Sequence, residues 1–276
     1  MNDGWKSDLE KWTREAQNDP RATHELITQA LTEPDEDAAW ERVSTLHYRA
    51  TNDVFDAACQ LCESACPQEM TLGANILGQL GIPDRSFPEE SVAVLLKLLE
   101  IESDVDILHA VCVALGHIHD PTAIPALARL KTHPSEIVRD AVVYGLLSFV
   151  EDLAVHSLSE LSNDQDDHVR DWATFGLGSM IEADTPQIRE ALFARLSDAD
   201  DVVRGEALVG LALRKDEQAI EPLIQELERY PAEKIGSLLI EAAEAMADTR
   251  LLPILTRLKQ SSGSEKFDEA IRCCSE

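Results

Sequence analysis

LSDADDVVRGEALVGLA (residues 196–212) and LSNDQDDHVRDWATFGLG (residues 161–178) are the two stretches that decide the fold. Each begins with a leucine, passes through an Asp-rich turn and reaches a Val-Arg pair that ends at Arg204 or Arg170. Beyond the pair, apolar residues recur at the three- and four-residue spacing of a helix, and no segment alternates as a half-buried strand does. The two stretches therefore indicate two copies of one helical unit.

The unit repeats along most of the chain. Aligned on the last leucine of a recurring apolar block, the copies fall at Leu99, Leu130, Leu161, Leu196, Leu227 and Leu258, in steps of 31, 31, 35, 31 and 31 residues. A period of this length is typical of repeat architectures. Ser135, Asp166 and Asp200 each precede the second helix of a unit as capping residues, and Pro125, Pro222 and Pro253 share one first-turn column. Each unit is therefore predicted to be a helical hairpin.

A single hairpin cannot bury both of its apolar stripes, so neighbouring hairpins must stack on one continuous core. About eight units fit into 276 residues, which predicts an all-α, right-handed α-solenoid. We expect an N-terminal capping helix in residues 1–20, formed by the stripe Trp5, Leu9, Trp12 and Ala16, with partner binding as the alternative role. Repeats follow in 21–260, weaker in 21–87 and clear in 88–260, and 261–276 form a C-terminal cap.

The runs 161–178 and 196–212 resemble HEAT repeats, in particular the short HEAT-like class also found in phycobilisome lyase subunits. The resemblance implies a structural ladder that holds adjacent units together, pairing Asp164 with Arg170 and Asp198 with Arg204. The equivalent position before Arg139 holds His133, so the ladder is not expected there. HEAT-like proteins include bilin lyases, DNA glycosylases and binding scaffolds, so the fold alone does not supply the function.

The surface charge excludes several partners. The chain has 52 Asp and Glu against 24 Lys and Arg, a formal charge of −28, which repels nucleic acids and anionic membranes. No apolar run is long enough to span a membrane, and the N-terminus has no signal core, so we expect a cytoplasmic protein. Acidic side chains cluster locally: residues 140–169 hold seven acids and neither Lys nor Arg.

Two local clusters contain residues that bind metals. Cys59, Cys62 and Cys66 share one helical stripe, which fits either a metal or iron–sulfur site or the packing of small side chains at a helix interface. His117, His119 and Asp120 fit either part of a metal site or a polar turn between units. Packing and turn roles are preferred, so no metal and no cofactor is predicted. Because no catalytic motif is found, we also predict that the protein is not an enzyme.

Numbering the second helix of each unit from its arginine separates a buried face from an open one. Positions −1, +3, +6 and +7 are expected to be buried, and positions +1, +2 and +5 are expected to face a groove. The latter are Asp140, Ala141 and Tyr144, then Asp171, Trp172 and Phe175, then Gly205, Glu206 and Val209. Aromatic side chains ringed by carboxylates are typical of protein-binding hot spots. Asp140, Tyr144, Asp171, Trp172, Phe175 and Glu206 are therefore predicted to bind a partner, with packing between units as the alternative for the rings.

These observations predict a non-catalytic scaffold whose acidic concave face binds a basic protein. A concrete version is an inhibitor or immunity protein that masks a cationic toxin or nuclease. The alternative is a lyase-like or chaperone-lyase HEAT-repeat subunit that acts on a bound cofactor or small molecule.

Overall fold

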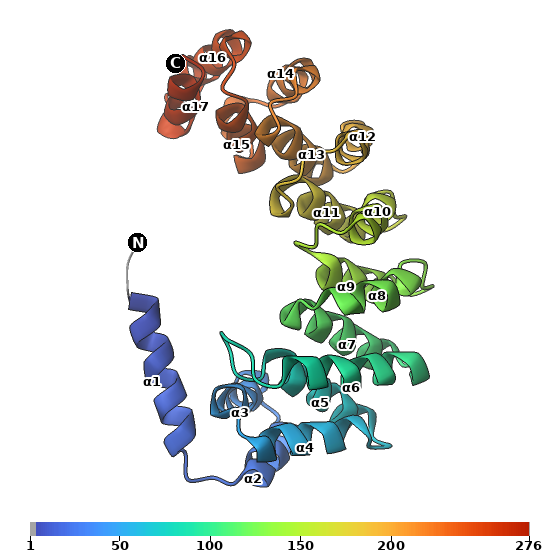
Figure 1. Cartoon of the computed structure of the whole chain (residues 1–276). Coiled ribbons are helices and arrows are strands. Elements are labelled where there is room, and N and C mark those ends of the chain that lie inside the picture. Colours follow the sequence, from blue (N-terminus) through green and yellow to red (C-terminus); the bar gives the residue numbers. More distant parts are fainter. Residues whose placement is uncertain (1–3, 276) are drawn as a thin grey trace. The chain divides into compact units, whose positions relative to one another are not determined.

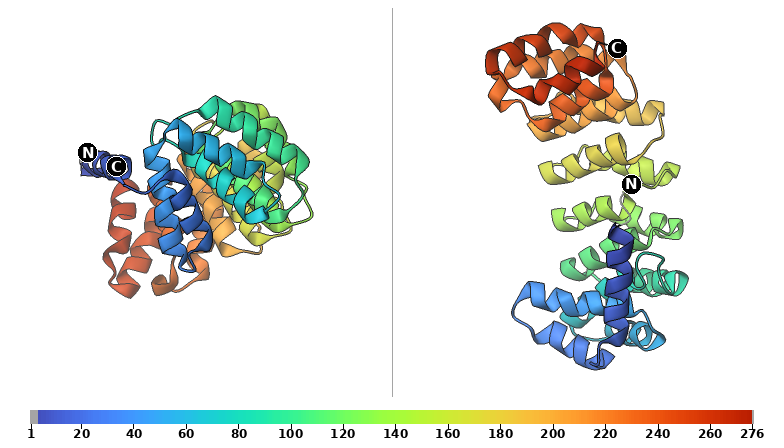
Figure 2. Two further views of the ribbon diagram at one scale, coloured as in Figure 1. Left: turned by 90° about the horizontal axis from the view of Figure 1, so that it is seen from below. Right: turned by 90° about the vertical axis from the view of Figure 1, so that its left-hand side faces the viewer.

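The computed structural model describes residues 4–275, which fold into two compact units, and the chain passes from one to the other between Gly145 and Leu146. Figure 1 shows the helices of both units in chain order, and Figure 2 shows them from two further directions. No strand occurs between residues 4 and 275, as expected for an all-α fold. The description below takes each unit by itself.

The first unit consists of α1 (Gly4–Asn18) and four hairpins. The hairpins pair α2 (Thr23–Thr32) with α3 (Glu36–Arg49), α4 (Asn52–Cys62) with α5 (Pro67–Gln79), α6 (Pro88–Ile101) with α7 (Val105–Ile118), and α8 (Ile124–Leu130) with α9 (Glu136–Leu146). The second helices α3, α5, α7 and α9 form one layer, and the first helices α4, α6 and α8 form another (Figure 1).

The second unit consists of four more hairpins. They pair α10 (Asp152–Leu161) with α11 (Asp167–Phe175), α12 (Pro186–Arg195) with α13 (Asp201–Leu213), α14 (Ile220–Arg229) with α15 (Ser237–Met246), and α16 (Leu252–Ser262) with α17 (Asp268–Cys273). A π-helical turn, η2 (Gly176–Met180), extends α11. With four hairpins in each unit, the predicted solenoid of about eight helical hairpins is confirmed.

The helices begin where the polar residues of the turns predict. The side chain of Asp166 accepts a hydrogen bond from the Val169 amide, and that of Asp200 accepts from the Val202 and Val203 amides. Asp104 caps α7 in the same way. Each of these caps satisfies amides that have no partner within the first turn of a helix.

The buried face of the second helices is confirmed. The side chains at positions −1, +3 and +7 from each arginine are at most 1% exposed, and the glycines at +6 are also buried. These residues are Val138, Val142, Gly145 and Leu146, then Val169, Ala173, Gly176 and Leu177, then Val203, Ala207, Gly210 and Leu211. This regular pattern gives each unit one continuous core.

Second helices approach one another at small residues. A Cβ atom added to Gly210 would lie 2.6 Å from the Cα atom of Gly178, and one added to Gly78 would lie 2.7 Å from the Cα atom of Ala114. Real Cβ atoms do not come so close to a neighbouring backbone, so only glycine fits. The second helices therefore pack almost backbone to backbone within each unit.

This close packing corrects part of the groove prediction. Ala141, Gly205 and Val209 were expected to face a groove, but all three are buried. Gly205, for example, lies against the side chain of Leu238 on α15. Positions +1, +2 and +5 thus lie partly at the contact between second helices, and only their larger or charged side chains reach solvent.

The two ends of the chain were predicted to be caps. On α1, Ala16 is buried, but Trp12 remains 48% exposed; Trp5 lies outside the residues whose side chains the structure describes. The boundary predicted at residue 260 falls inside α16, and Phe267 is fully buried in the last hairpin. Within residues 4–275, no helix combines the length and the hydrophobicity needed to cross a membrane.

Candidate protein-binding surface

The turn before each anchoring arginine is held through its backbone. Nη1 of Arg139 donates to the carbonyls of His133 and Pro134 at 2.8 and 3.2 Å. Arg170 and Arg204 make the same two contacts with the residues six and five positions earlier, at 2.8 to 3.2 Å. Because the acceptors are main-chain oxygens, the contact does not depend on which side chain occupies the turn.

The carboxylate partners of Arg170 and Arg204 come from the following hairpin. Arg170 binds Asp198 through two hydrogen bonds of 2.9 and 3.0 Å, and Arg204 binds Glu226 with Nε to Oε1 at 3.0 Å. The predicted pairs, Asp164 with Arg170 and Asp198 with Arg204, therefore share a turn, but Arg170 and Arg204 contact only the carbonyl oxygens of these aspartates. In Arg170 and Arg204, Nη1 binds the carbonyls of the preceding turn, and Nε binds a carboxylate of the following hairpin.

His133 takes the place of aspartate in its turn. Its Nδ1 accepts a hydrogen bond of 3.1 Å from the Ser135 amide. Oδ1 of Asp164 accepts from the Asp166 amide at 2.9 Å, and Oδ1 of Asp198 accepts from the Asp200 amide at 3.1 Å. The turn geometry therefore persists at Arg139, where sequence reasoning did not expect it.

Arg214 is a further structural cation that the sequence did not reveal. Its guanidinium donates six hydrogen bonds to five carbonyls, those of Leu177, Gly178, Ile181, Ala183 and Gly210. These carbonyls lie in α13 and around the π-helical turn η2, where the i to i−4 pattern of α11 is broken. Several of the few basic side chains in the second unit are thus used inside it, and this leaves surface carboxylates uncompensated.

Three such carboxylates form a row along the second helices α11, α13 and α15, which we call the carboxylate row: Asp171, Glu206 and Glu241. They follow one another at steps of 35 residues, one from each helix. Asp171 and Glu206 are half-buried, and Glu241 is exposed. Among the described residues, no Lys or Arg forms an ion pair with any of the three.

The negative charges of the carboxylate row are unfavourable where they lie, because the carboxylates are partly buried and repel one another. Burial, with the neighbouring charges of Asp171 and Glu241, raises the pKa of Glu206 to about 7. Burial and the charge of Asp200 also raise the pKa of Asp171, and its Oδ1 is buried without a hydrogen-bond partner. Carboxylates that are half-buried near one another favour protonation, or the arrival of a positive charge from outside.

Aromatic side chains flank the row on α11. Trp172 and Phe175 are half-buried and meet edge to face with ring centroids 5.6 Å apart. His168 lies beside Trp172 at 6.3 Å. The structure thus places Asp171, Trp172 and Phe175 on α11 and Glu206 on α13 near Asp171, all in the second unit. Asp140 and Tyr144, also half-buried, lie on α9 in the first unit.

Glu241 was missing from the predicted site. The copy of the repeat around Ala242 lacks the Val-Arg pair, so the alignment that located the other positions did not extend to it. The repeat step of 31 residues from Leu196 to Leu227 places the copy of Glu206 at Ser237, so the register alone would not have located Glu241.

In both of the clusters that could bind a metal, one residue has a packing or capping role in the fold. Cys62 is buried, and its Sγ atom packs so closely against Gly73 of α5 that a Cβ atom on this glycine would clash with it. Burial raises the pKa of this thiol to about 12. Asp120 caps the turn after α7 by accepting from the amide and the hydroxyl of Thr122. Within residues 8–275, no group of three or more His, Cys, Asp or Glu side chains is arranged to hold a metal ion.

Comparison with known proteins agrees with the repeat. A family model for HEAT repeats matches residues 71–147, 92–178 and 154–243, which together span more than half of the chain. The chain belongs to the HEAT-repeat family. The predicted family is therefore confirmed.

This HEAT-repeat chain is 26% identical to Protein YibA from Escherichia coli (strain K12) over 248 residues, 86% of each chain. The X-ray structure of the E. coli YibA protein matches it with a TM-score of 0.74 at 22% identity, covering 96% of this chain and 95% of that one. The complex of CpcE and CpcF of phycocyanin lyase from Nostoc sp. PCC7120 matches with a TM-score of 0.45 at 19% identity, covering 94% and 96%. The likeness to YibA shows that the two chains share a fold.

Proposed function

We propose that the protein is a non-catalytic scaffold that binds a basic protein through the second helices of its hairpins. The observation that carries the proposal is the carboxylate row, in which Glu206 lies half-buried between Asp171 and Glu241 without a cation of its own. An Arg or Lys side chain from a partner would relieve this repulsion and form charge-assisted hydrogen bonds. Trp172 and Phe175 would add apolar contact area beside the charges.

A stoichiometric inhibitor is the concrete form that we propose, for example an immunity protein that masks a cationic toxin or nuclease. The formal charge of −28 supports fast, electrostatically steered association with such a partner. The six free cysteines support a reducing compartment, so we propose the cytoplasm as the site of action.

Neutralising the carboxylate row tests the proposal. We expect Asp171→Asn, Glu206→Gln and Glu241→Gln together to weaken binding of a short arginine-rich peptide by about tenfold or more at low salt. The matched control removes three exposed carboxylates from first helices, as Asp152→Asn, Glu190→Gln and Glu221→Gln, and leaves the same net charge. Isothermal titration of both variants over a salt series measures the effect. Equal weakening in the two variants would show that only net charge matters.

The aromatic side chains provide a second test. Trp172→Ala together with Tyr144→Ala should weaken binding of the basic partner, because desolvated rings supply much of the affinity at hot spots. The melting temperature should change little, since both side chains are half-buried. A large drop in the melting temperature would instead show that the rings serve packing.

A further inference from the structure

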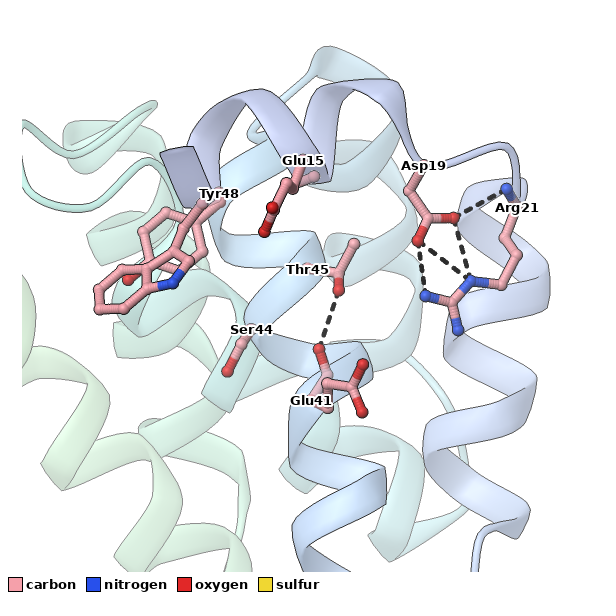
Figure 3. A pocket seen from close by; sticks show the side chains of 9 residues that line it. Glu15, Asp19, Arg21, Glu41, Ser44, Thr45 and Tyr48 are labelled. Atoms are coloured by element: carbon pink, nitrogen blue, oxygen red, sulfur yellow. Dashed lines mark hydrogen bonds and ion pairs between the residues drawn. The ribbon is translucent and has the colours of Figure 1, made fainter. Parts of the chain in front are cut away.

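A pocket of about 420 Å³ lies between α1 and α3 in the first unit (Figure 3), and none of its lining residues belongs to the carboxylate row. Its volume is within the range of small-ligand sites. Neither the repeat pattern nor the proposed function explains it. Its lining combines two aromatic rings, three carboxylates, two hydroxyls and one arginine.

Two ring systems form one wall of the pocket. The centroids of Trp12 and Tyr48 lie 6.0 Å apart, and the rings are tilted by 46°. Trp12 is 48% exposed, and Tyr48 is half-buried. No cation among the described residues lies over either ring. The negative faces of such rings attract a cation placed within about 6 Å.

The charged lining is negative even after its internal pairing. Arg21 forms hydrogen bonds of 2.6 to 3.2 Å with both carboxylate oxygens of Asp19 and lowers the pKa of that carboxyl to about 2. Figure 3 shows this pair at one end of the pocket, and Glu15 and Glu41 remain on other sides of it.

Glu15 and Glu41 have only weak partners. Nζ of Lys11 lies 4.0 Å from Oε1 of Glu15, and both side chains are more than 60% exposed. Arg42 lies 3.2 Å from Glu41, which is 72% exposed. Exposed ion pairs of this kind contribute little to stability, so an incoming cation can replace them.

The walls are fixed before any ligand arrives. Arg49 on α3 donates to the carbonyls of Ala16, Asp19 and Arg21 at 3.3, 3.1 and 2.9 Å, which ties the α1–α2 connection to α3. Ala16 is buried at the base of α1. Thr45 on the pocket floor donates its hydroxyl proton to the Glu41 carbonyl at 2.9 Å, so only its lone pairs remain for a ligand. The backbone that carries these acceptors and ring faces is therefore held in place, and the lining favours a ligand that is positive and donates hydrogen bonds.

We propose that this pocket binds a guanidinium or alkylammonium group, supplied by an arginine or lysine side chain of the basic partner. The cation lies against Trp12 and Tyr48, and its N–H groups reach Glu15 and Glu41. That the partner is a basic protein rests on the proposed function. That the pocket binds a cation rests only on its own lining residues.

The test uses the full chain and single-residue probes. With ¹⁵N-labelled tryptophan, the indole N–H signal of Trp12, assigned through Trp12→Phe, is followed during titration with N-acetyl-arginine methylamide at low salt. We expect a saturable shift with a dissociation constant on the order of millimolar. N-acetyl-citrulline methylamide, the neutral isostere of the arginine probe, should give no saturable shift. N-acetyl-lysine methylamide and tetramethylammonium show whether a side chain or any small organic cation is accepted.

Matched variants separate the pocket from the general field. Glu15→Gln with Glu41→Gln should weaken arginine binding by about fivefold or more. Glu10→Gln with Glu36→Gln removes the same charge from α1 and α3 outside the pocket and should change it less than about twofold. The proposal is overturned if citrulline binds equally well, if the control pair weakens binding as much, or if the Trp12 signal does not move.

The outcome is independent of the carboxylate row. If the arginine-rich peptide depends on Asp171, Glu206 and Glu241 but Trp12 never responds, the pocket proposal fails alone. If the arginine probe moves Trp12 but the peptide is insensitive to the row, the proposed function fails and the pocket remains.

Discussion

The residues up to Gly145 contain 25 acidic and 11 basic side chains, and those from Leu146 onward contain 27 and 13, so each unit has a formal charge of −14. Their second helices nevertheless differ. At positions +1, +2 and +5, α7 has His109, Ala110 and Val113 and α9 has one carboxylate, Asp140. The neighbouring helices α11 and α13 instead carry one carboxylate each, Asp171 and Glu206. Net charge alone therefore does not locate a binding surface. What distinguishes the second unit is that its carboxylates are half-buried beside one another.

Both units share the close packing of second helices at glycine residues, and substituting these glycines is expected to have the largest effect on stability. Gly210→Ala should lower the free energy of unfolding by about 3 kcal/mol, since the new Cβ atom would lie 2.6 Å from backbone. Gly78→Ala in the first unit should cost a similar amount. Chemical denaturation measures both, with Gly236→Ala as the control because nothing lies within 4 Å of its Cβ position. A loss of less than about 1 kcal/mol at Gly210 would mean that the helices separate easily.

Substitutions in the turns are expected to lower the free energy of unfolding by less than the glycine substitutions, and by different amounts in the two units. Asp198 binds Arg170 and Arg195 and is 5% exposed, so Asp198→Ala should cost about 2 kcal/mol by leaving two guanidinium groups without their carboxylate. His133→Ala in the first unit removes one hydrogen bond to the Ser135 amide and should cost about 0.5 kcal/mol. Thermal and denaturant unfolding of the two variants compare these costs. Equal losses would contradict the difference between the turns.

A further effect on stability is expected at Glu206 and depends on pH. Its folded-state pKa of about 7 lies above the ordinary value of 4.5, so the folded chain binds more protons than the unfolded chain between these values. Stability should therefore fall as the pH rises through this window. Glu206→Gln should stabilise the protein by about 1 kcal/mol at pH 8 and have no effect near pH 4.

Unfolding of wild type and Glu206→Gln across this pH range checks the sign. Glu190→Gln, at an exposed position on α12, serves as the control for the loss of one carboxylate. A destabilising Glu206→Gln at pH 8 would mean that the carboxylate has a partner inside the molecule, and the contrast between the two units would disappear.

Much of the fold could be predicted because it follows from local patterns. The caps at Asp166 and Asp200 and the buried positions −1, +3, +6 and +7 depend on residues within one or two turns of a helix. The contacts that were missed join different hairpins. That Arg170 binds Asp198, and that Arg214 binds carbonyls around η2, depends on how one hairpin is stacked on the next, which periodicity does not encode.

The candidate sites show the same limit. Asp171 and Glu206 could be identified from their register in the repeat, whereas Glu241 lies in a copy that had lost its arginine. The α1 pocket brings Trp12 together with Tyr48, from a helix outside the repeat and one in its weakest copy. No period relates these two residues, so no alignment of repeats could have joined them.

The arginines at 139, 170 and 204 bind main-chain oxygens of their turns. A change of turn side chain therefore leaves the anchor in place, as His133 already illustrates beside Asp164 and Asp198. Turn side chains that bind no arginine, unlike Asp198, can therefore change during evolution while the scaffold is retained. For an engineer, such turns are positions where recognition loops can be grafted onto a stable array.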